Sequence, residues 1–273
     1  MASLPPTRVH LFNSSGSPSI DVVELARYAR RLLGGAEVRH YGDFIGYCLG
    51  ACDPSDAERL KADLAEMLSE ARVTDLVGKR DRTRQPQPVV EYERRMLERK
   101  PPRPVGVLYD GFDLCAAYDL LLSNAGISSD DLVVVITNLL FGTLEGDDGR
   151  YHARVIVFGS PCVVSTSGLV EAPARPRAYY LEERLGVTTP QEQEDMPEKW
   201  LRVNDPRTTE VLKGYVAQAI FYHATGEPFC EERGCRLFNA HWQEDLLFSQ
   251  LESEAEFCEY HDRTVKTLSR RYS

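Results

Sequence analysis

Three cysteines and one histidine near the end of the chain form the pattern that most constrains its fold. They occur as Cys-x4-Cys at Cys230 and Cys235, a spacer of 22 residues, and Cys-x2-His at Cys258 and His261. Two close ligand pairs brought together by an intervening element are typical of a closed tetrahedral zinc site. Ordinary buried cysteines beside a surface histidine are the alternative. Four of the thirteen Cys and His residues fall within 32 positions, which favours zinc.

A helix is predicted directly before this pattern. Asp205, followed by proline, suits an N-cap, and Gly226 suits the C-terminal end. Ala219 and His223 stand four residues apart and therefore share a helix face. In a zinc peptidase with a His-Glu-x-x-His helix, both would be histidine, and a glutamate after the first would act as general base. Here that second position is Ile220.

Together these residues resemble the archaemetzincin motif, His-Glu-x-x-His-x-x-Gly-x-x-His-Cys-x4-Cys-x-Met followed by a Cys-x-x-Cys pair. The matching positions are His223, Gly226, Cys230, Cys235, Cys258 and His261, the last pair after a slightly longer spacer. The departures are Ala219, Ile220, Phe229 and Leu237, which replace the first histidine, the glutamate, the third histidine and the methionine. Segments 132–137, 154–159 and 165–167 resemble the family's strand before the substrate cleft and the segment that follows it. The resemblance implies a metzincin-like fold, a retained structural zinc ion and a degenerate catalytic site.

Composition limits the classes of function. The formal net charge is -10 and the pI about 5.2, so the molecule as a whole repels nucleic acid. Seven cysteines without a disulfide spacing favour a reducing compartment, and no apolar run reaches the length of a membrane span, so we expect a cytoplasmic protein with no membrane association. The stretch 78–104 is the local exception, with nine Lys or Arg against four acids between prolines. It is either an insert that binds RNA or an acidic partner, or a solvated connector.

The remaining pattern predicts an α/β (α+β) fold. Apolar strands at 8–12, 36–41, 105–109 and 132–137 alternate with helices at 17–33, 55–72 and 113–124, which is typical of a mixed, mainly parallel sheet flanked by helices. Residues 147–149 suit a hairpin turn, and further helices are predicted over 176–185, 239–251 and 262–271. We expect one domain over 1–273, in which 205–273 carries the degenerate helix and the zinc-binding part.

Three functions compete. An active zinc peptidase would need a second, catalytic zinc ion and substitute groups, for which the candidates are His152, His223, Glu227, His241 and Glu244. A non-catalytic descendant would keep one structural zinc ion and bind an extended peptide by strand addition. An RNA-associated protein would act through 78–104. The spacing of the cysteines favours a metallopeptidase relative, and the loss of the histidines favours an inactive one.

Overall fold

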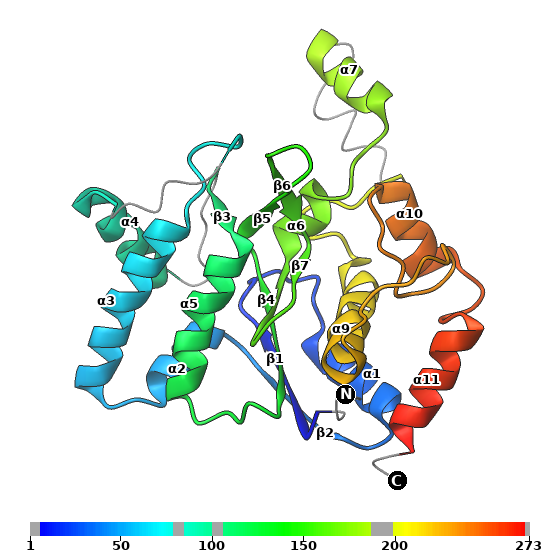
Figure 1. Cartoon of the computed structure of the whole chain (residues 1–273), viewed down its shortest axis with the longest axis horizontal. Helices are drawn as coiled ribbons and strands as arrows, with labels where there is room; N and C mark the ends of the chain where they lie inside the picture. The colour runs from blue at the N-terminus through cyan, green and yellow to red at the C-terminus, as the bar shows by residue number, and fades with distance from the viewer. Residues whose placement is uncertain (1–5, 79–84, 100–105, 187–198, 271–273) are drawn as a thin grey trace. The chain divides into compact units, whose positions relative to one another are not determined.

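A computed structural model describes residues 6–78, 85–99, 106–186 and 199–270 of the chain (Figure 1). Contacts divide the chain into two compact units. Unit 1 comprises Ser17–Ala36 and the described part of Leu169–Ser273, and unit 2 comprises Pro6–Gly16 and the described part of Glu37–Gly168. Each unit is described by itself.

Unit 2 contains a five-stranded sheet in the order β2-β1-β4-β8-β7. The strands are β1 (Arg8–Asn13), β2 (Glu37–Tyr41), β4 (Leu132–Thr137), β7 (Ile156–Val157) and β8 (Cys162–Ser165). The first four in the spatial order are parallel and β7 alone runs antiparallel, at the edge. All six residues of β4 are buried, as expected for a β-branched central strand.

A second, three-stranded sheet of unit 2 has the order β3-β5-β6. Its strands are β3 (Leu108–Asp110), β5 (Leu140–Leu144) and β6 (Tyr151–Arg154). β5 and β6 form an antiparallel hairpin whose turn contains Gly149 with φ 65°, so the predicted turn at 147–149 is confirmed. Segment 154–159 does not form one continuous strand. β6 ends at Arg154 and β7 covers only two residues before Gly159, Ser160 and Pro161 interrupt it.

The helices of unit 2 are α2 (Phe44–Gly50), α3 (Pro54–Ala71), α4 (Gln87–Leu97) and α5 (Gly111–Asn124), and α6 (Thr166–Glu171) follows the last strand. Side chains from α2, α3 and α5 form one buried apolar core with the strands, including Phe12, Leu64, Tyr118 and Phe141. The predicted α/β class with a mainly parallel sheet is therefore confirmed.

Unit 1 is helical among the residues described. Its elements are α1 (Val22–Leu33), α7 (Arg177–Leu185), α9 (Thr208–Thr225), α10 (Gln243–Leu247), the π-helical turn η1 (Phe248–Glu252) and α11 (Glu259–Ser269). Helix α1 packs against both α9 and α11. At its end Gly34 has φ 64°, and a Cβ there would lie 2.3 Å from the carbonyl oxygen of Ser269. The close approach of α11 therefore requires a glycine.

Several predicted helix boundaries are wrong. Asp205 does not cap α9. Its Oδ1 accepts from the Arg207 backbone N–H at 2.9 Å, which forms a turn, and the helix begins at Thr208. Helix α1 begins at Val22 because Asp21 caps it by accepting from Glu24 N at 2.9 Å. The helix predicted over 239–251 is shorter and ends in a π turn, while the last helix begins three residues earlier than predicted.

The basic stretch 78–104 falls partly outside the described residues. Within it, α4 contacts α3 through ion pairs: Arg94 lies 3.5 Å from Glu58, and Lys61 lies 3.0 Å from Glu98. Some of its charge is thus directed toward the protein itself. Among the described residues, no helix combines the length and the apolar character that a membrane crossing requires.

Candidate metal centre

A loop and the start of a helix bring the two ligand pairs together. Cys230 and Cys235 lie in the loop that follows α9, whose last turn ends at Gly226 in the left-handed conformation (φ 78°). Cys258 is the N-cap residue of α11, and His261 lies in the first turn of that helix. One ligand atom from each of the four lies within 4.8 Å of every other. The pairs that the spacing predicted are therefore side by side.

The distances suit a tetrahedral zinc ion. With Zn–S bonds of about 2.3 Å and Zn–N bonds of about 2.0 Å, tetrahedral geometry places two sulfurs about 3.8 Å apart and a sulfur and a nitrogen about 3.5 Å apart. Cys230 Sγ lies 3.9 Å from Cys258 Sγ, and Cys235 Sγ lies 3.6 Å from His261 Nδ1. Cys258 Sγ and His261 Nδ1 are 3.1 Å apart and would separate slightly around the ion. The donor set fits zinc in number, chemistry and spacing.

The backbone of the loop is folded around the first pair. Cys230 N donates to Leu237 O and Cys235 N to Glu232 O, both at 2.9 Å. Glu232 N lies 3.3 Å from Cys230 Sγ and points its hydrogen at the sulfur. An N–H group directed at a sulfur stabilises the thiolate that metal binding requires. The loop therefore has the geometry of a ligand-presenting turn.

Burial sets the protonation of these groups in the absence of a cation. Burial raises the pKa of the Cys235 thiol to about 12, and it also raises the pKa of Cys230. Burial lowers the pKa of His261, against the influence of Glu232 and Glu227. A neutral imidazole is the ligand form of histidine, whereas the thiols lose their protons when a cation binds. A cation that binds here must therefore displace the thiol protons.

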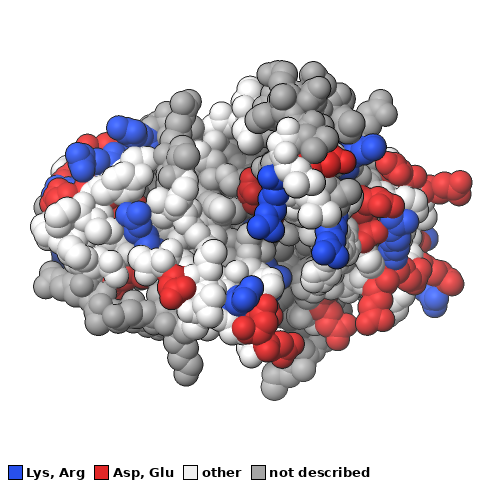
Figure 2. Space-filling view, turned by 90° about the horizontal axis from the view of Figure 1, so that it is seen from above, with Lys and Arg blue, Asp and Glu red and all other residues white. Residues whose placement is uncertain are grey.

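Aromatic rings and carboxylates surround the cluster. The ring of Phe221 packs edge-on against His261 at 5.3 Å, and that of Tyr260 packs on it at 4.9 Å. Segment 227–270 carries ten carboxylates against five Lys and Arg. In Figure 2 carboxylates gather on the side where α10 and α11 lie. This charge favours cations near the site and disfavours polyanions.

The other predicted site residues do not join this cluster. On α9, Ala219 and Ile220 are fully buried in the core, and His223 is half-buried. Glu227 is exposed, and its charge reaches His261. His241 is exposed, and its carbonyl oxygen accepts from Ala174 N at 2.8 Å.

Glu244 and His152 have other partners. Glu244 is exposed and lies 3.4 Å from Arg233. His152 belongs to unit 2, where its Nε2 lies 2.8 Å from Asp148 Oδ2 in the β5–β6 hairpin. Among the described residues, Cys230, Cys235, Cys258 and His261 are the only group of three or more potential ligands close enough to share an ion.

Three of the four remaining cysteines have the character of core residues, and Cys52 is half-buried. Cys48, Cys115 and Cys162 are buried, and burial raises the pKa of the Cys162 thiol to about 11. That direction opposes a nucleophilic role. Sequence reasoning missed the charged side chains that flank the cluster, Arg236 and Glu256. Their positions next to Cys235 and two residues before Cys258 were the available signal.

A family model described as "Probable metallopeptidase family (DUF6775)" matches residues 5–268. No curated protein and no solved structure matches the chain significantly.

Proposed function

We propose, on the premise that the chain belongs to this probable metallopeptidase family, that Cys230, Cys235, Cys258 and His261 hold one structural zinc ion. The observation that supports this most directly is the complete donor set, in which four protein ligands lie within 4.8 Å of one another. A catalytic zinc site keeps one position open for water, whereas a site with four protein ligands is closed. When bound, the ion connects the loop after α9 to helix α11. Elsewhere in the chain such connections are made by apolar packing.

We further propose that the chain is an archaemetzincin-like protein that has lost the catalytic zinc ion. Its six histidines are all among the described residues, and only His261 belongs to a cluster of potential ligands there. The helix positions that carry the first histidine and the glutamate in the related motif are Ala219 and Ile220, both fully buried. Loss of a general base alone costs roughly 10²- to 10⁴-fold in rate.

The activity that fits these features is binding of an extended peptide without cleavage. Strand β7 lies at the edge of the main sheet and is its one antiparallel member among the described strands. Ser165 N of β8 donates to Val155 O at 2.7 Å. Since hydrogen-bonding direction alternates along a strand, the N–H and C=O of Ile156 point away from β8. An added peptide strand would pair with Ile156.

Metal analysis tests the zinc assignment and the loss of catalysis together. We expect one zinc ion per chain, lost in Cys235→Ser and kept in the control Cys52→Ser, whose cysteine lies outside the cluster. Cobalt in place of zinc should give thiolate-to-metal absorption bands. Two zinc ions per chain would favour an active peptidase, and zinc-free native protein would refute the site.

Peptide binding tests the remaining step. Purified zinc-bound protein, screened against a library of extended peptides, should bind some members and leave them intact after long incubation. Ile156→Pro should abolish this binding because it removes the outward N–H, whereas Ile156→Ala retains the N–H and should still bind. Chelator-sensitive cleavage by the pure protein would overturn the proposal.

A further inference from the structure

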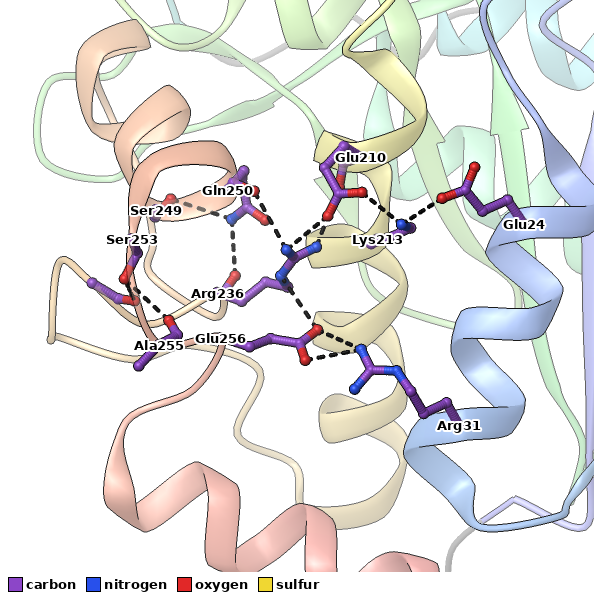
Figure 3. A network of polar contacts seen from close by, with 11 residues as sticks. Glu24, Arg31, Glu210, Lys213, Arg236, Ser249, Gln250, Ser253, Ala255 and Glu256 are labelled. Atoms are coloured by element: carbon purple, nitrogen blue, oxygen red, sulfur yellow. Dashed lines mark hydrogen bonds and ion pairs between the residues drawn. The ribbon is translucent and has the colours of Figure 1, made fainter.

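Arg236, the residue after the second cysteine, lies at the centre of a polar network in unit 1 (Figure 3). Its side chain is 11% exposed, and Nη2 donates to Glu210 Oε1 of α9 at 2.8 Å. Its Nε lies 3.5 Å from Glu256 Oε1. The guanidinium also donates to the backbone carbonyl oxygens of Glu210 and Gln250, both at 3.4 Å. Because an enclosed guanidinium needs such partners held in place, Arg236 fixes the position of the loop relative to α9.

Glu256, two residues before the third cysteine, extends the network to α1. Arg31 Nη2 lies 2.8 Å from both carboxylate oxygens of Glu256. A second link joins α9 to α1, where Lys213 Nζ lies 2.6 Å from Glu24 Oε1. The backbone N–H of Arg236 also donates to Glu256 O at 2.9 Å. Arg236 and Glu256, which lie close in sequence to two metal ligands, thus contact each other and the helices α9 and α1.

Gln250 of the π-helical turn η1 and Ser253 directly after it contact the backbone on either side of the second cysteine, and Figure 3 shows Gln250 beside Arg236. Gln250 Nε2 donates to Arg236 O at 2.9 Å, and Ser253 Oγ donates to Gly234 O at 2.6 Å. Gln250 approaches α9 at Gly214, where a Cβ would lie 2.1 Å from Gln250 Oε1. π turns frequently mark functional sites. Both chain neighbours of the second cysteine are therefore anchored by side chains.

We infer that four charged residues position the zinc ligands although none of them touches the ion: Arg31, Glu210, Arg236 and Glu256. The inference rests on the proposed zinc site. A closed site surrounds zinc with protein ligands. Moving a ligand segment away from the ion here also breaks the contacts of Arg236 and Glu256. Residues behind the ligands typically change metal affinity by roughly 10- to 100-fold. The network therefore sets how slowly zinc dissociates.

The same coupling acts in reverse. Two events linked through one network stabilise each other by equal free energies. Bound zinc therefore stabilises the contacts of α1 with α9 and with the C-terminal segment, although α1 contributes no ligand. Helix α1 lies far before Cys230, the first ligand of the cluster, in sequence. Arg31 is separated from Glu256 by 225 positions.

Zinc transfer to an excess of a chromogenic chelator measures this directly. Glu210→Gln and Glu256→Gln in the zinc-bound full chain should each release zinc roughly tenfold faster than the wild type. Glu259→Gln is the matched control, because it makes the same charge change beside Cys258 at an exposed residue that pairs with Arg263 at 2.9 Å. Its rate should stay within about twofold, since it lies outside the network.

Arg31→Gln avoids a folding artefact, because the Arg31 side chain is 59% exposed and its loss leaves the core unchanged. It should also accelerate zinc release, whereas Arg27→Gln, at an exposed arginine of the same helix, should not. Equal release from all variants and controls would overturn the inference and leave the zinc site standing. A wild-type protein that binds neither zinc nor cobalt would overturn the zinc site first, and the inference with it.

Discussion

Unit 2 and the C-terminal segment 227–270 of unit 1 are stabilised by different interactions. The core of unit 2 joins more than twenty buried side chains from strands and helices. In segment 227–270 the large buried apolar side chains are few: Leu237, Leu246, Leu247, Phe257 and Leu268. Ion pairs join it to α9 and α1, and it contains the Cys and His cluster at which we propose that zinc binds.

The difference shows how two parts of one chain can lose structure independently. Burial of apolar surface is spread over many contacts, so one substitution removes a fraction of it. A metal centre concentrates the stabilising free energy in four side chains, and removing the ion or one ligand removes nearly all of it. Each experiment below affects one region and monitors the other.

Metal removal should have the largest effect. Structural zinc contributes apparent binding free energies of about 10 to 16 kcal/mol, which is comparable to the whole stability of a domain. Chelation of the wild type, or Cys235→Ser, should therefore expose the amides of α11 and of the 230–238 loop to rapid hydrogen exchange. The amides of β4 and α5 should stay protected. Equal exchange in both regions would contradict the comparison.

A substitution in the core of unit 2 should have the reverse pattern. Phe141→Ala removes a fully buried ring from β5 and should lower the free energy of unfolding by about 3 to 5 kcal/mol. Zinc content should remain one ion per chain. The control is Phe112→Ala, at a phenylalanine that is 62% exposed, which should change stability by about 0.5 kcal/mol or less. Loss of zinc in Phe141→Ala would show that the regions are not independent.

Two glycines in the left-handed backbone conformation allow the cost of a steric clash to be distinguished from the cost of backbone strain. Gly34→Ala places a methyl group 2.3 Å from the Ser269 carbonyl oxygen at φ 64°, so it should cost about 2 to 4 kcal/mol and detach the end of α11. Gly126→Ala, in unit 2, has φ 68° and no atom within 4 Å of the added carbon. Its cost should be about 1 kcal/mol from strain alone. Urea unfolding measures both, and equal losses would contradict the close approach of α11.

The sequence predicted those features that depend on local chemistry. The β-branched run of β4 identified a central strand, and the spacing of Cys230, Cys235, Cys258 and His261 identified which side chains would meet. Glycine identified the end of α9 at Gly226. Each of these signals depends on a few neighbouring residues, so it survives without knowledge of the tertiary structure.

Contacts between residues that are far apart in sequence could not be predicted in the same way. Arg236 and Glu210 are 26 residues apart, and Arg31 and Glu256 are 225 apart, so no local spacing pairs them. The start of α9 was misplaced because Asp205 has an alternative use, in which its carboxylate holds Arg207. A carboxylate before a helix can cap it or form a turn, and the surrounding contacts decide between the two.

The smallest expected effect concerns the buried carboxyl of Glu93 in unit 2. Burial raises the pKa of Glu93, against the hydrogen bond from Tyr109 OH at 3.0 Å and the charge of Arg72. A carboxyl with a raised folded-state pKa stabilises the protein fully below its ordinary pKa of 4.5, and this contribution is lost as the pH rises through the raised value. Glu93→Gln removes the titration.

The stability of Glu93→Gln relative to the wild type should therefore increase between pH 4 and pH 7, as the buried carboxyl of the wild type ionises. Glu98→Gln, at the C-cap of the same helix, gives the opposite sign. The ammonium of Lys61 lowers the pKa of Glu98, so that carboxylate stabilises the protein above its ordinary pKa, and the variant loses stability as the pH rises. Urea unfolding at several pH values measures both. Parallel curves would show that Glu93 is solvated and that the apolar core of unit 2 ends before α4.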